Sequence, residues 1–361
     1  MQIKLINLSL PFSLYWWDPV ESNNMCPKTK KELLSNSTMA EPKDELPAVI
    51  VLGRPSVLNF YGDQFSSKFR LLKPWESSLP LDQFISTHAQ TVQAMFCSGT
   101  TCVTPSLLRQ LPSLRVIVTT SAGLNHMDLD ECRRLGISVA NAGTVFSEDV
   151  ADFAVGLLID VLRKISVANR FVKNGLWPLH EDYPLASKVG GRKVGIVGLG
   201  SIGLEVAKRL EAFGCIISYQ SRKKKPVVYS FYPDVHELAT KCNVLVICCA
   251  LTDETHHLIN KKVLLALGKE GVIINIARGA IINEMELVQC LVQGQIAGAG
   301  LDVFENEPNV PEELFSLDNV VLSQHVAFFT EDSFRDLYEL MSGNLEAFFL
   351  NKPLLSPVLD D

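Results

Sequence analysis

The feature that most constrains this chain of 361 residues is a short glycine-rich turn between an apolar run and a helical pattern. The turn reads Gly198-Leu199-Gly200-Ser201-Ile202-Gly203; it follows the apolar residues 194–197 and precedes a helix-like stretch, 204–210. In such a turn the first glycine permits a tight bend, the second lets a ligand approach the backbone, and the third lets helix and strand pack closely. The N–H groups at the helix N-terminus then favour bound phosphate. The pattern predicts a dinucleotide site, and the alternative is a glycine-rich turn without a ligand.

Two alternations of apolar runs and helical segments predict two parallel sheets. The first has expected strands at 48–52, 70–72, 94–97, 115–119 and 138–140. The second has expected strands at 193–197, 215–219, 244–248, 272–275, 298–301 and 320–322, which makes a doubly wound sheet. A long helical segment from Ser147 to about Lys173 joins them, and Ser147 with Asp149 suits its N-terminal cap.

The sequence therefore predicts an α/β protein with two doubly wound domains and a cleft between them. Residues 146–328 form the expected Rossmann domain for the cofactor. Residues 47–145, completed by the helical tail 329–361, form the expected flavodoxin-like substrate domain. Residues 1–46 are expected to be a disordered extension; their first 38 residues hold no arginine and three acidic residues, which disfavours a transit peptide. Met39 is an alternative start.

Composition narrows the class of partner. Hydrophobic residues make up 47% of the chain and the formal net charge is −7, so neither nucleic acid nor an anionic membrane is an expected partner. No apolar run reaches the length of a membrane span. The nine cysteines include no C-x-x-C pair, which favours buried, reduced thiols and a cytosolic location. No Cys/His spacing predicts a metal site.

A basic turn follows the second strand of the later alternation, where a dinucleotide fold often has an acidic residue for the ribose 2′-hydroxyl of NAD. This chain has Ser221-Arg222-Lys223-Lys224-Lys225 there and no carboxylate. Guanidinium and ammonium groups would pair with a 2′-phosphate, which a carboxylate would repel. The turn predicts a preference for NADPH, with weaker use of NADH. The alternative is a solvated basic turn.

Three polar side chains follow the last three expected strands. They are Arg278 in Asn275-Ile276-Ala277-Arg278-Gly279, Glu307 at the end of the stretch 301–308, and His325 in 323–327. Doubly wound folds bind ligands beyond the carboxyl ends of their strands. Each residue alone has a plain structural interpretation, as a salt-bridge arginine, a loop carboxylate or a hydrogen-bonded histidine. Together, behind a dinucleotide motif, they predict a catalytic site.

These segments resemble the D-isomer-specific 2-hydroxyacid dehydrogenase family. The resemblance rests on 198–203, Ala277-Arg278-Gly279, 301–308 and His325, extends to 121–128 and 149–152, and covers roughly residues 48–358. Within the family the chain is most similar to plant glyoxylate/hydroxypyruvate reductases and hydroxyphenylpyruvate reductases. The resemblance implies an NAD(P)-dependent reductase of small anionic 2-oxo acids, converting glyoxylate to glycolate and hydroxypyruvate to D-glycerate.

The resemblance also implies a role for each candidate residue. Arg278 would hold the substrate carboxylate and polarise the 2-oxo group, and His325 would donate a proton as hydride reaches the carbonyl carbon. Glu307 would orient His325 and favour its protonated form. The loop Ser98-Gly99-Thr100 resembles one that binds the substrate carboxylate, although an ordinary glycine turn is the alternative. The implied cofactor-binding residues are Gly198, Leu199, Gly200, Ser201, Ile202, Gly203, Ser221, Arg222, Lys223, Ala250, Leu251, Ile276, Ala277, Asp302 and Ala327.

The chain departs from the family near the expected proton donor. Gln324 stands where the family often has proline, and Phe328 and Phe329 follow the small residue Ala327. The two phenylalanines would either reshape the substrate pocket or belong to the core of the closing helix. Several family members form two-fold dimers through the segment after the interdomain helix, here Arg170 to about Leu185. An exposed Trp177 there would fit a homodimer interface; a buried Trp177 would be a core residue.

Two other functions remain open at this point. One is a reductase of aromatic 2-oxo acids such as hydroxyphenylpyruvate. The other, from a different class, is a nucleotide-sensing corepressor that keeps the three residues and works by binding partners. The sequence ranks neither the substrates nor the physiological direction.

Overall fold

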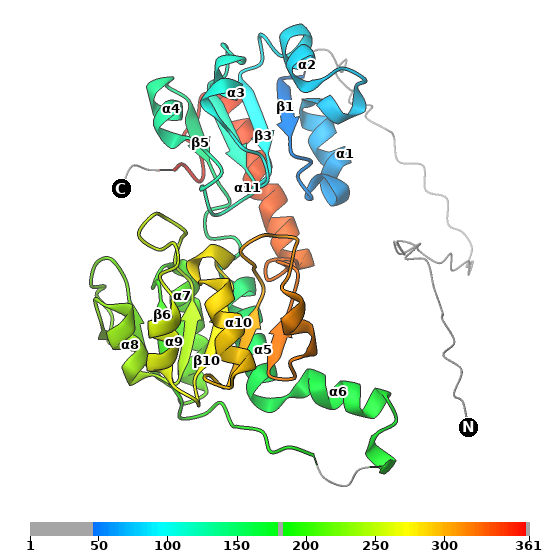
Figure 1. The fold of residues 1–361 in the computed structure, drawn as a ribbon. Helices are drawn as coiled ribbons and strands as arrows, with labels where there is room; N and C mark the ends of the chain where they lie inside the picture. The colour runs from blue at the N-terminus through cyan, green and yellow to red at the C-terminus, as the bar shows by residue number, and fades with distance from the viewer. Residues whose placement is uncertain (1–45, 180–182, 359–361) are drawn as a thin grey trace, which may run out of the picture. The chain divides into compact units, whose positions relative to one another are not determined.

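The computed structural model describes residues 46–179 and 183–358, so all but the last residue of the predicted extension 1–46 lies outside the described residues. A first sheet is built from five parallel strands in the order β2-β1-β3-β4-β5 (Figure 1). Its strands are β1 Ala48–Leu52, β2 Arg70–Leu72, β3 Ala94–Cys97, β4 Val116–Thr119 and β5 Ser138–Ala140. Its helices are α1 Leu58–Lys68, α2 Leu81–His88, α3 Pro105–Arg109 and α4 Leu129–Arg134. The central strands β3 and β4 are buried throughout, as expected of parallel strands covered on both faces.

The second sheet has seven parallel strands in the order β12-β11-β10-β9-β6-β7-β8. Because the order reverses beside β6, the carboxyl ends of β6 and β9 form the switch point at which such sheets bind ligands. The strands are β6 Lys193–Val197, β7 Ile216–Gln220, β8 Ser230–Phe231, β9 Val244–Ile247, β10 Val272–Asn275, β11 Gly298–Leu301 and β12 Val320–Leu322. The helices among them are α7 Ser201–Ala212, α8 Val235–Lys241, α9 Lys261–Leu267 and α10 Glu284–Val292.

The expectation of six strands in this sheet is wrong by one. The additional strand β8 pairs only two residues, Ser230 and Phe231, with β7. A pairing this short leaves no periodic apolar pattern in the sequence. The other strands agree with the expected ranges to within one residue at either end, and the predicted α/β fold is confirmed.

The long helix expected from Ser147 to about Lys173 is two helices, α5 Ser147–Arg163 and α6 Ile165–Lys173. Lys164 between them adopts a left-handed conformation with φ of 54°. The Asp160 carboxylate accepts the Ser166 backbone N–H at 2.8 Å, so an acid in the last turn of α5 stabilises the start of α6. The cap prediction is also wrong: the N-cap residue of α5 is Phe146, and Ser147 is already helical.

The tail returns to the first sheet, as expected. Helix α11, Glu331–Phe349, contacts β4 and α1. Buried α11 residues such as Leu337 and Met341 share one hydrophobic cluster with strands of both sheets and with α5. The division into domains at 146 and 329 stays a prediction, whereas the two sheets and the returning helix are observed.

The eight cysteines in the described residues are free. Five are buried, but Cys102 is exposed and Cys248 and Cys249 are half-buried, so the expectation of uniformly buried thiols is wrong. Burial raises the pKa of Cys97 to about 12 and that of Cys249 to about 11, so both thiols stay protonated. In the described part of the chain no helix has the length and apolar character needed to span a membrane.

Candidate active site

The glycine turn connects β6 to α7, and each of its three glycines meets a different requirement. Gly198 has φ of +95°, and a Cβ there would lie 2.5 Å from the Cα of Cys249 after β9. A Cβ on Gly203 would lie 2.2 Å from the carbonyl oxygen of Gly198, so helix and turn touch. A Cβ on Gly200 would meet no atom within 4 Å. The open space therefore lies at Gly200, directly before α7 begins at Ser201. In turns of this kind the second glycine is the one whose backbone the pyrophosphate approaches.

The basic turn follows β7 at the next strand end. Ser221 donates its hydroxyl to the Lys223 carbonyl at 2.6 Å, which closes the turn, and residues 222–225 are exposed. A hydrogen bond from Thr252, then a backbone hydrogen bond and the charge of Arg222, lower the pKa of the Glu254 carboxyl. Glu254 therefore lies within electrostatic range of Arg222. The loop 250–255 is closed by Thr255, which donates to the Ala250 carbonyl at 2.7 Å.

Arg278 stands at the end of β10 on a loop held by Asn275. The Asn275 side chain is buried; its oxygen accepts the Ala277 N–H at 3.1 Å and its amide donates to the Arg278 carbonyl at 3.0 Å. A Cβ on Gly279 would lie 1.9 Å from the carbonyl carbon of Phe304, so this loop packs directly on the loop after β11. Burial lowers the pKa of Arg278 and the charge of Glu307 opposes this. A guanidinium stays charged in proteins, so Arg278 presents a partly buried cation.

His325 and Glu307 form a hydrogen-bonded pair. His325 Nδ1 lies 2.9 Å from Glu307 Oε2, and the Phe304 N–H donates to Glu307 Oε1 at 3.1 Å. Burial alone would raise the pKa of the Glu307 carboxyl, but the hydrogen bond and charge of His325, with help from the Phe304 N–H and Arg278, hold it below its usual range. An ionised Glu307 bound to Nδ1 leaves Nε2 as the ring nitrogen for a substrate.

Asp302 holds the loop that carries His325. Its side chain is fully buried and accepts the Ser323 hydroxyl at 2.7 Å and the N–H groups of Val326 and Ala327 at 2.9 and 3.0 Å. Its carbonyl accepts the His325 N–H at 2.7 Å. His325 has φ of 57°, a left-handed conformation that costs energy in a non-glycine residue and is sustained by such bonds. These partners make Asp302 a positioning residue, and its contact with a cofactor stays a prediction.

The first sheet presents two loops toward this chemistry. Ser98-Gly99-Thr100 follows β3 as a turn in which Ser98 Oγ donates to the Gly53 carbonyl at 2.8 Å and lies 2.8 Å from Thr100 Oγ1. A Cβ on Gly123, after β4, would lie 2.5 Å from Nη2 of Arg278. The loop beside Arg278 is therefore the one after β4, and a role for Ser98-Gly99-Thr100 in substrate binding stays a prediction.

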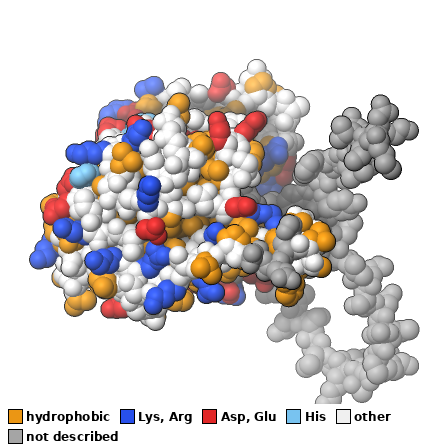
Figure 2. All heavy atoms as spheres, turned by 60° about the horizontal axis from the view of Figure 1, so that its bottom comes forward, with side chains coloured by type: hydrophobic (Ala, Val, Ile, Leu, Met, Phe, Trp, Pro, Cys, Tyr) orange, Lys and Arg blue, Asp and Glu red, His pale blue; other side chains and the backbone are white. Residues whose placement is uncertain are grey.

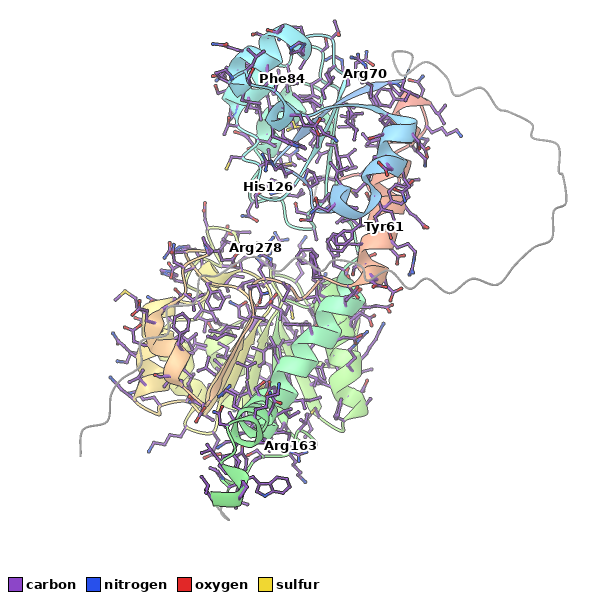
Figure 3. All side chains as sticks on the ribbon, turned by 90° about the vertical axis from the view of Figure 1, so that its right-hand side faces the viewer. Tyr61, Arg70, Phe84, His126, Arg163 and Arg278 are labelled. Atoms are coloured by element: carbon purple, nitrogen blue, oxygen red, sulfur yellow. The ribbon has the colours of Figure 1, made fainter. Side chains whose placement is uncertain are left out.

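His126 belongs to the same loop as Gly123. In the view of Figure 3, His126 lies below the first sheet and on the side of Arg278, which lies at the upper edge of the second sheet. Burial, followed by the charge of Arg278, lowers the pKa of His126, so its imidazole is neutral near pH 7. His126 also lines a cavity of about 910 Å³ formed by residues 102–105, 125–130, Arg133 and 252–254. Arg278, Glu307 and His325 do not line this cavity; His126 lines it and lies within electrostatic range of Arg278.

The two phenylalanines after Ala327 have different environments. Phe328 packs on Phe146 with ring centroids 5.1 Å apart and stands edge-on to His325 at 6.3 Å. Phe329 is 51% exposed and lies 6.3 Å from the ring of Phe60. Phe328 is thus both a core residue and a neighbour of His325. Of the remaining predicted cofactor residues, Ile276, Ala277 and Ala327 are buried and Leu251 packs on the core of the second sheet.

The structure brings Arg278, Glu307 and His325 to neighbouring strand ends, as the sequence predicts. It adds Asn275, Gly123 and His126, which the sequence does not single out. Asn275 could have been found from its place at the end of a buried strand, where a polar residue is unusual. His126 lies in the stretch 121–128 that resembles the family, but its relation to Arg278 depends on how the two sheets fold toward one another.

Comparison with known proteins agrees with this geometry. Residues 155–327 match the family model of the D-isomer specific 2-hydroxyacid dehydrogenase, NAD binding domain. A glyoxylate/hydroxypyruvate reductase of Arabidopsis thaliana is 53% identical over 322 residues, which cover 89% of this chain and 99% of that protein. A hydroxyphenylpyruvate reductase of Plectranthus scutellarioides is 43% identical and covers 87% of this chain and all of that protein.

Solved structures show the same fold. The NADPH-dependent glyoxylate/hydroxypyruvate reductase of Sinorhizobium meliloti, in complex with NADP and malonate, has a TM-score of 0.79 at 35% identity and covers 86% of this chain and 96% of that one. A 2-hydroxyacid dehydrogenase of Ketogulonicigenium vulgare has a TM-score of 0.82 at 32% identity and covers 87% of this chain and 98% of that one. The predicted resemblance is confirmed: the chain belongs to the D-isomer-specific 2-hydroxyacid dehydrogenase family.

Proposed function

We propose that this protein is an NADPH-dependent reductase of small 2-oxo acids, with glyoxylate and hydroxypyruvate as its substrates. The observation that carries the proposal is the His325–Glu307 pair at 2.9 Å, held within electrostatic range of Arg278. Relatives named for glyoxylate and hydroxypyruvate reduction match nearly the full chain. A reductase of aromatic 2-oxo acids is a weaker alternative, favoured by the Plectranthus relative and by the rings around Phe328.

The residues perform this reaction as follows. The Arg278 guanidinium binds the substrate carboxylate and polarises the 2-oxo group. A nicotinamide cofactor held by the turn 198–203 and the basic turn 221–223 would supply the hydride. Protonated His325 gives its Nε2 proton to the oxygen that becomes the hydroxyl, so the charge developing there is neutralised. Glu307 holds Nδ1–H and stabilises the imidazolium before transfer.

NADPH is favoured over NADH by the turn after β7, where the cations of Arg222, Lys223, Lys224 and Lys225 are exposed and the turn itself contains no acidic residue. The Sinorhizobium relative carries NADP in its complex. A cytosolic location and a homodimer complete the proposal. Free cysteines favour a reducing compartment. Trp177, which is 70% exposed in the predicted dimer segment, favours an interface.

The deciding experiment is a substrate panel assayed with NADPH and with NADH on the full chain. Glyoxylate and hydroxypyruvate should be turned over with a higher kcat/KM for NADPH, and hydroxyphenylpyruvate less well. His325→Asn is the matched variant, because asparagine tolerates the left-handed backbone at this position. It should lose about 10²–10⁴ in kcat, the share of a general acid, while binding NADPH unchanged. Tight NADPH binding with no turnover of any 2-oxo acid would favour the corepressor-like alternative.

A further inference from the structure

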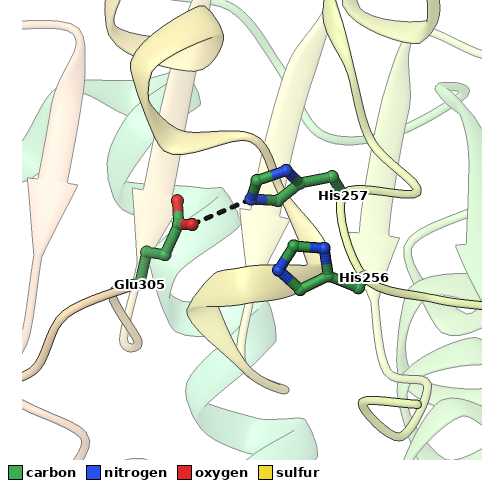
Figure 4. A group of neighbouring side chains, drawn as sticks. All are labelled: His256, His257 and Glu305. Carbon is green, nitrogen blue, oxygen red and sulfur yellow. Dashed lines mark hydrogen bonds and ion pairs between the residues drawn. The ribbon is translucent and has the colours of Figure 1, made fainter. Parts of the chain in front are cut away.

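A cluster of metal-binding side chains lies outside the residues assigned to catalysis. His256 and His257 belong to the loop after β9, and Glu305 belongs to the loop after β11. Both imidazoles turn a ring nitrogen toward the Glu305 carboxylate, and His257 Nε2 lies 2.8 Å from Glu305 Oε1 (Figure 4). The two histidine rings stack with centroids 4.0 Å apart. One ligand atom from each of the three residues lies within 4.8 Å of the others.

We propose that His256, His257 and Glu305 bind a divalent transition-metal ion of the zinc type, with water completing its coordination. Two imidazole nitrogens and one carboxylate oxygen favour such an ion over Mg²⁺ or Ca²⁺, which prefer oxygen ligands. Bonds of about 2.1 Å in a tetrahedral site place neighbouring ligand atoms about 3.4 Å apart. The His257–Glu305 contact of 2.8 Å would therefore open by about 0.6 Å, and the other ligand atoms, which lie within 4.8 Å of one another, would adjust to the same spacing.

The backbone around the cluster already orients two of the ligands. His257 adopts a left-handed conformation with φ of 50°, and its N–H donates to the Ala280 carbonyl at 2.9 Å. The Glu305 N–H donates to the Glu284 carboxylate at 3.0 Å, which fixes the start of the Glu305 side chain. The side chains of His257 and Glu305 are 34% and 25% exposed, so both are restrained and still reachable from water.

The site would join three loops that also carry the catalytic residues. His256 and His257 extend the predicted cofactor loop, Ala280 follows Arg278 by two residues, and Glu305 precedes Glu307 by two. A bound ion would thus stabilise these loops against one another. It would take no part in hydride or proton transfer, because His257 contacts Glu305 and not the reacting pair. The cysteine and histidine spacing predicts no metal site, since Glu305 stands 48 residues from His257 and meets it only in the fold.

The test is calorimetric titration of Zn²⁺ into the full chain after chelator treatment, with Co²⁺ absorption in the visible region as a second readout. We expect one ion per chain and a raised unfolding temperature. His257→Asn, which keeps the left-handed backbone, and Glu305→Gln should each weaken affinity at least about tenfold. His256→Gln, on an exposed ring, serves the same purpose if either variant unfolds. His236→Gln on α8 is the matched control and should bind like the wild type.

The three ligand variants must keep their NADPH affinity, which shows that they are folded. Equal Zn²⁺ affinity in the wild type and in all three ligand variants would overturn the proposal. So would failure of the wild type to bind more tightly than a variant lacking all three side chains. Loss of reductase activity in the metal-free wild type, with affinity unchanged, would contradict the separation of this site from catalysis.

Discussion

Among single residues, the Glu307 carboxylate has the most direct effect on the reacting histidine. Glu307→Gln keeps a hydrogen-bond acceptor near His325 Nδ1 and removes the negative charge that stabilises the imidazolium. The imidazolium that donates the proton then lacks its charge partner, so kcat/KM for 2-oxo acid reduction should fall while NADPH binding is kept. Turnover at pH 7 should fall about tenfold or more.

The lowered pKa of Glu307 also predicts how the stability of the folded protein depends on pH. Since the pKa of Glu307 is lowered in the folded protein, its stabilising interactions are present above its unfolded pKa of about 4.3 and are lost only as pH falls below that value. The wild type should therefore show no Glu307-linked loss of stability between pH 5 and 7, followed by a decline in more acid solution. The unfolding temperature, measured from pH 7 to below pH 5, tests this expected change in stability. A profile for Glu307→Gln that overlays the wild type would contradict the assigned role.

Substitutions of Arg222 and Glu254 should have opposite effects on the affinity for NADPH. Arg222→Ala should weaken NADPH binding more than NADH binding, because only NADPH carries the 2′-phosphate. Glu254→Gln should do the reverse and strengthen NADPH binding about two- to fivefold, since its carboxylate lies within electrostatic range of Arg222. Fluorescence titration of both cofactors measures these changes. Equal effects on NADPH and NADH in either variant would exclude the turn as the 2′-phosphate site.

Elements of the fold were predictable from sequence wherever they are buried and regular. Strands such as β10 and β11 are short apolar runs with sharp ends, and their carboxyl ends predict the positions of Arg278 and Glu307 from the sequence alone. The break at Lys164 was missed because it is stabilised by a hydrogen bond from the Ser166 N–H to the Asp160 carboxylate. Such a bond leaves no gap in the apolar pattern of the sequence. The His256–His257–Glu305 cluster was missed for a similar reason, since its members meet only through the register of β9, β10 and β11.

The β6–α7 turn offers a matched pair of glycine substitutions. Gly203→Ala places a Cβ 2.2 Å from the Gly198 carbonyl and should destabilise the fold by about 1–3 kcal/mol. Gly200→Ala places a Cβ in open space at an ordinary φ of −85° and should leave the unfolding temperature nearly unchanged. It should still weaken NADPH binding, because the added methyl occupies the predicted pyrophosphate position. Denaturant unfolding and cofactor titration separate the two effects; a Gly200→Ala variant with wild-type affinity would place the pyrophosphate elsewhere.

In the whole molecule, the chain crosses between the two sheets twice, through α5 and through α11. Asp149 in the first turn of α5 accepts the hydroxyl of Thr330, the N-cap residue of α11, at 2.5 Å. The end of α11 is held by Asn344, which is fully buried and bonds Leu355 and Ser356 of the final segment. That segment then pairs with β5 through Pro357. The site residues 277–325 thus lie between two crossings that are tied to each other.

Removal of the Asn344 amide tests this connection. Asn344→Ala removes the acceptor of the Leu355 and Ser356 N–H groups and the donor to Ser356 Oγ. Each unsatisfied buried group costs about 1–3 kcal/mol, so the variant should unfold at markedly lower denaturant concentration. NADPH affinity of the folded fraction should be unchanged, because the second sheet is untouched. Glu339→Gln, on the same helix and exposed, is the control and should unfold with the wild type.

At the scale of the whole molecule, the exposed side chains after α6 predict a homodimer. The end of the molecule that carries α6 faces the viewer in Figure 2. Hydrophobic side chains are exposed there among charged ones. In the predicted dimer segment, Trp177 and Leu179 are 70% and 73% exposed. Exposed aromatic and aliphatic side chains at one end of a molecule are typical of an interface.

Trp177→Ser with Leu179→Ser should convert a dimer into a monomer in light scattering. Leu355→Ser, 60% exposed on the final segment, should not. A wild type that is monomeric at micromolar concentration would show that these side chains serve no homodimer.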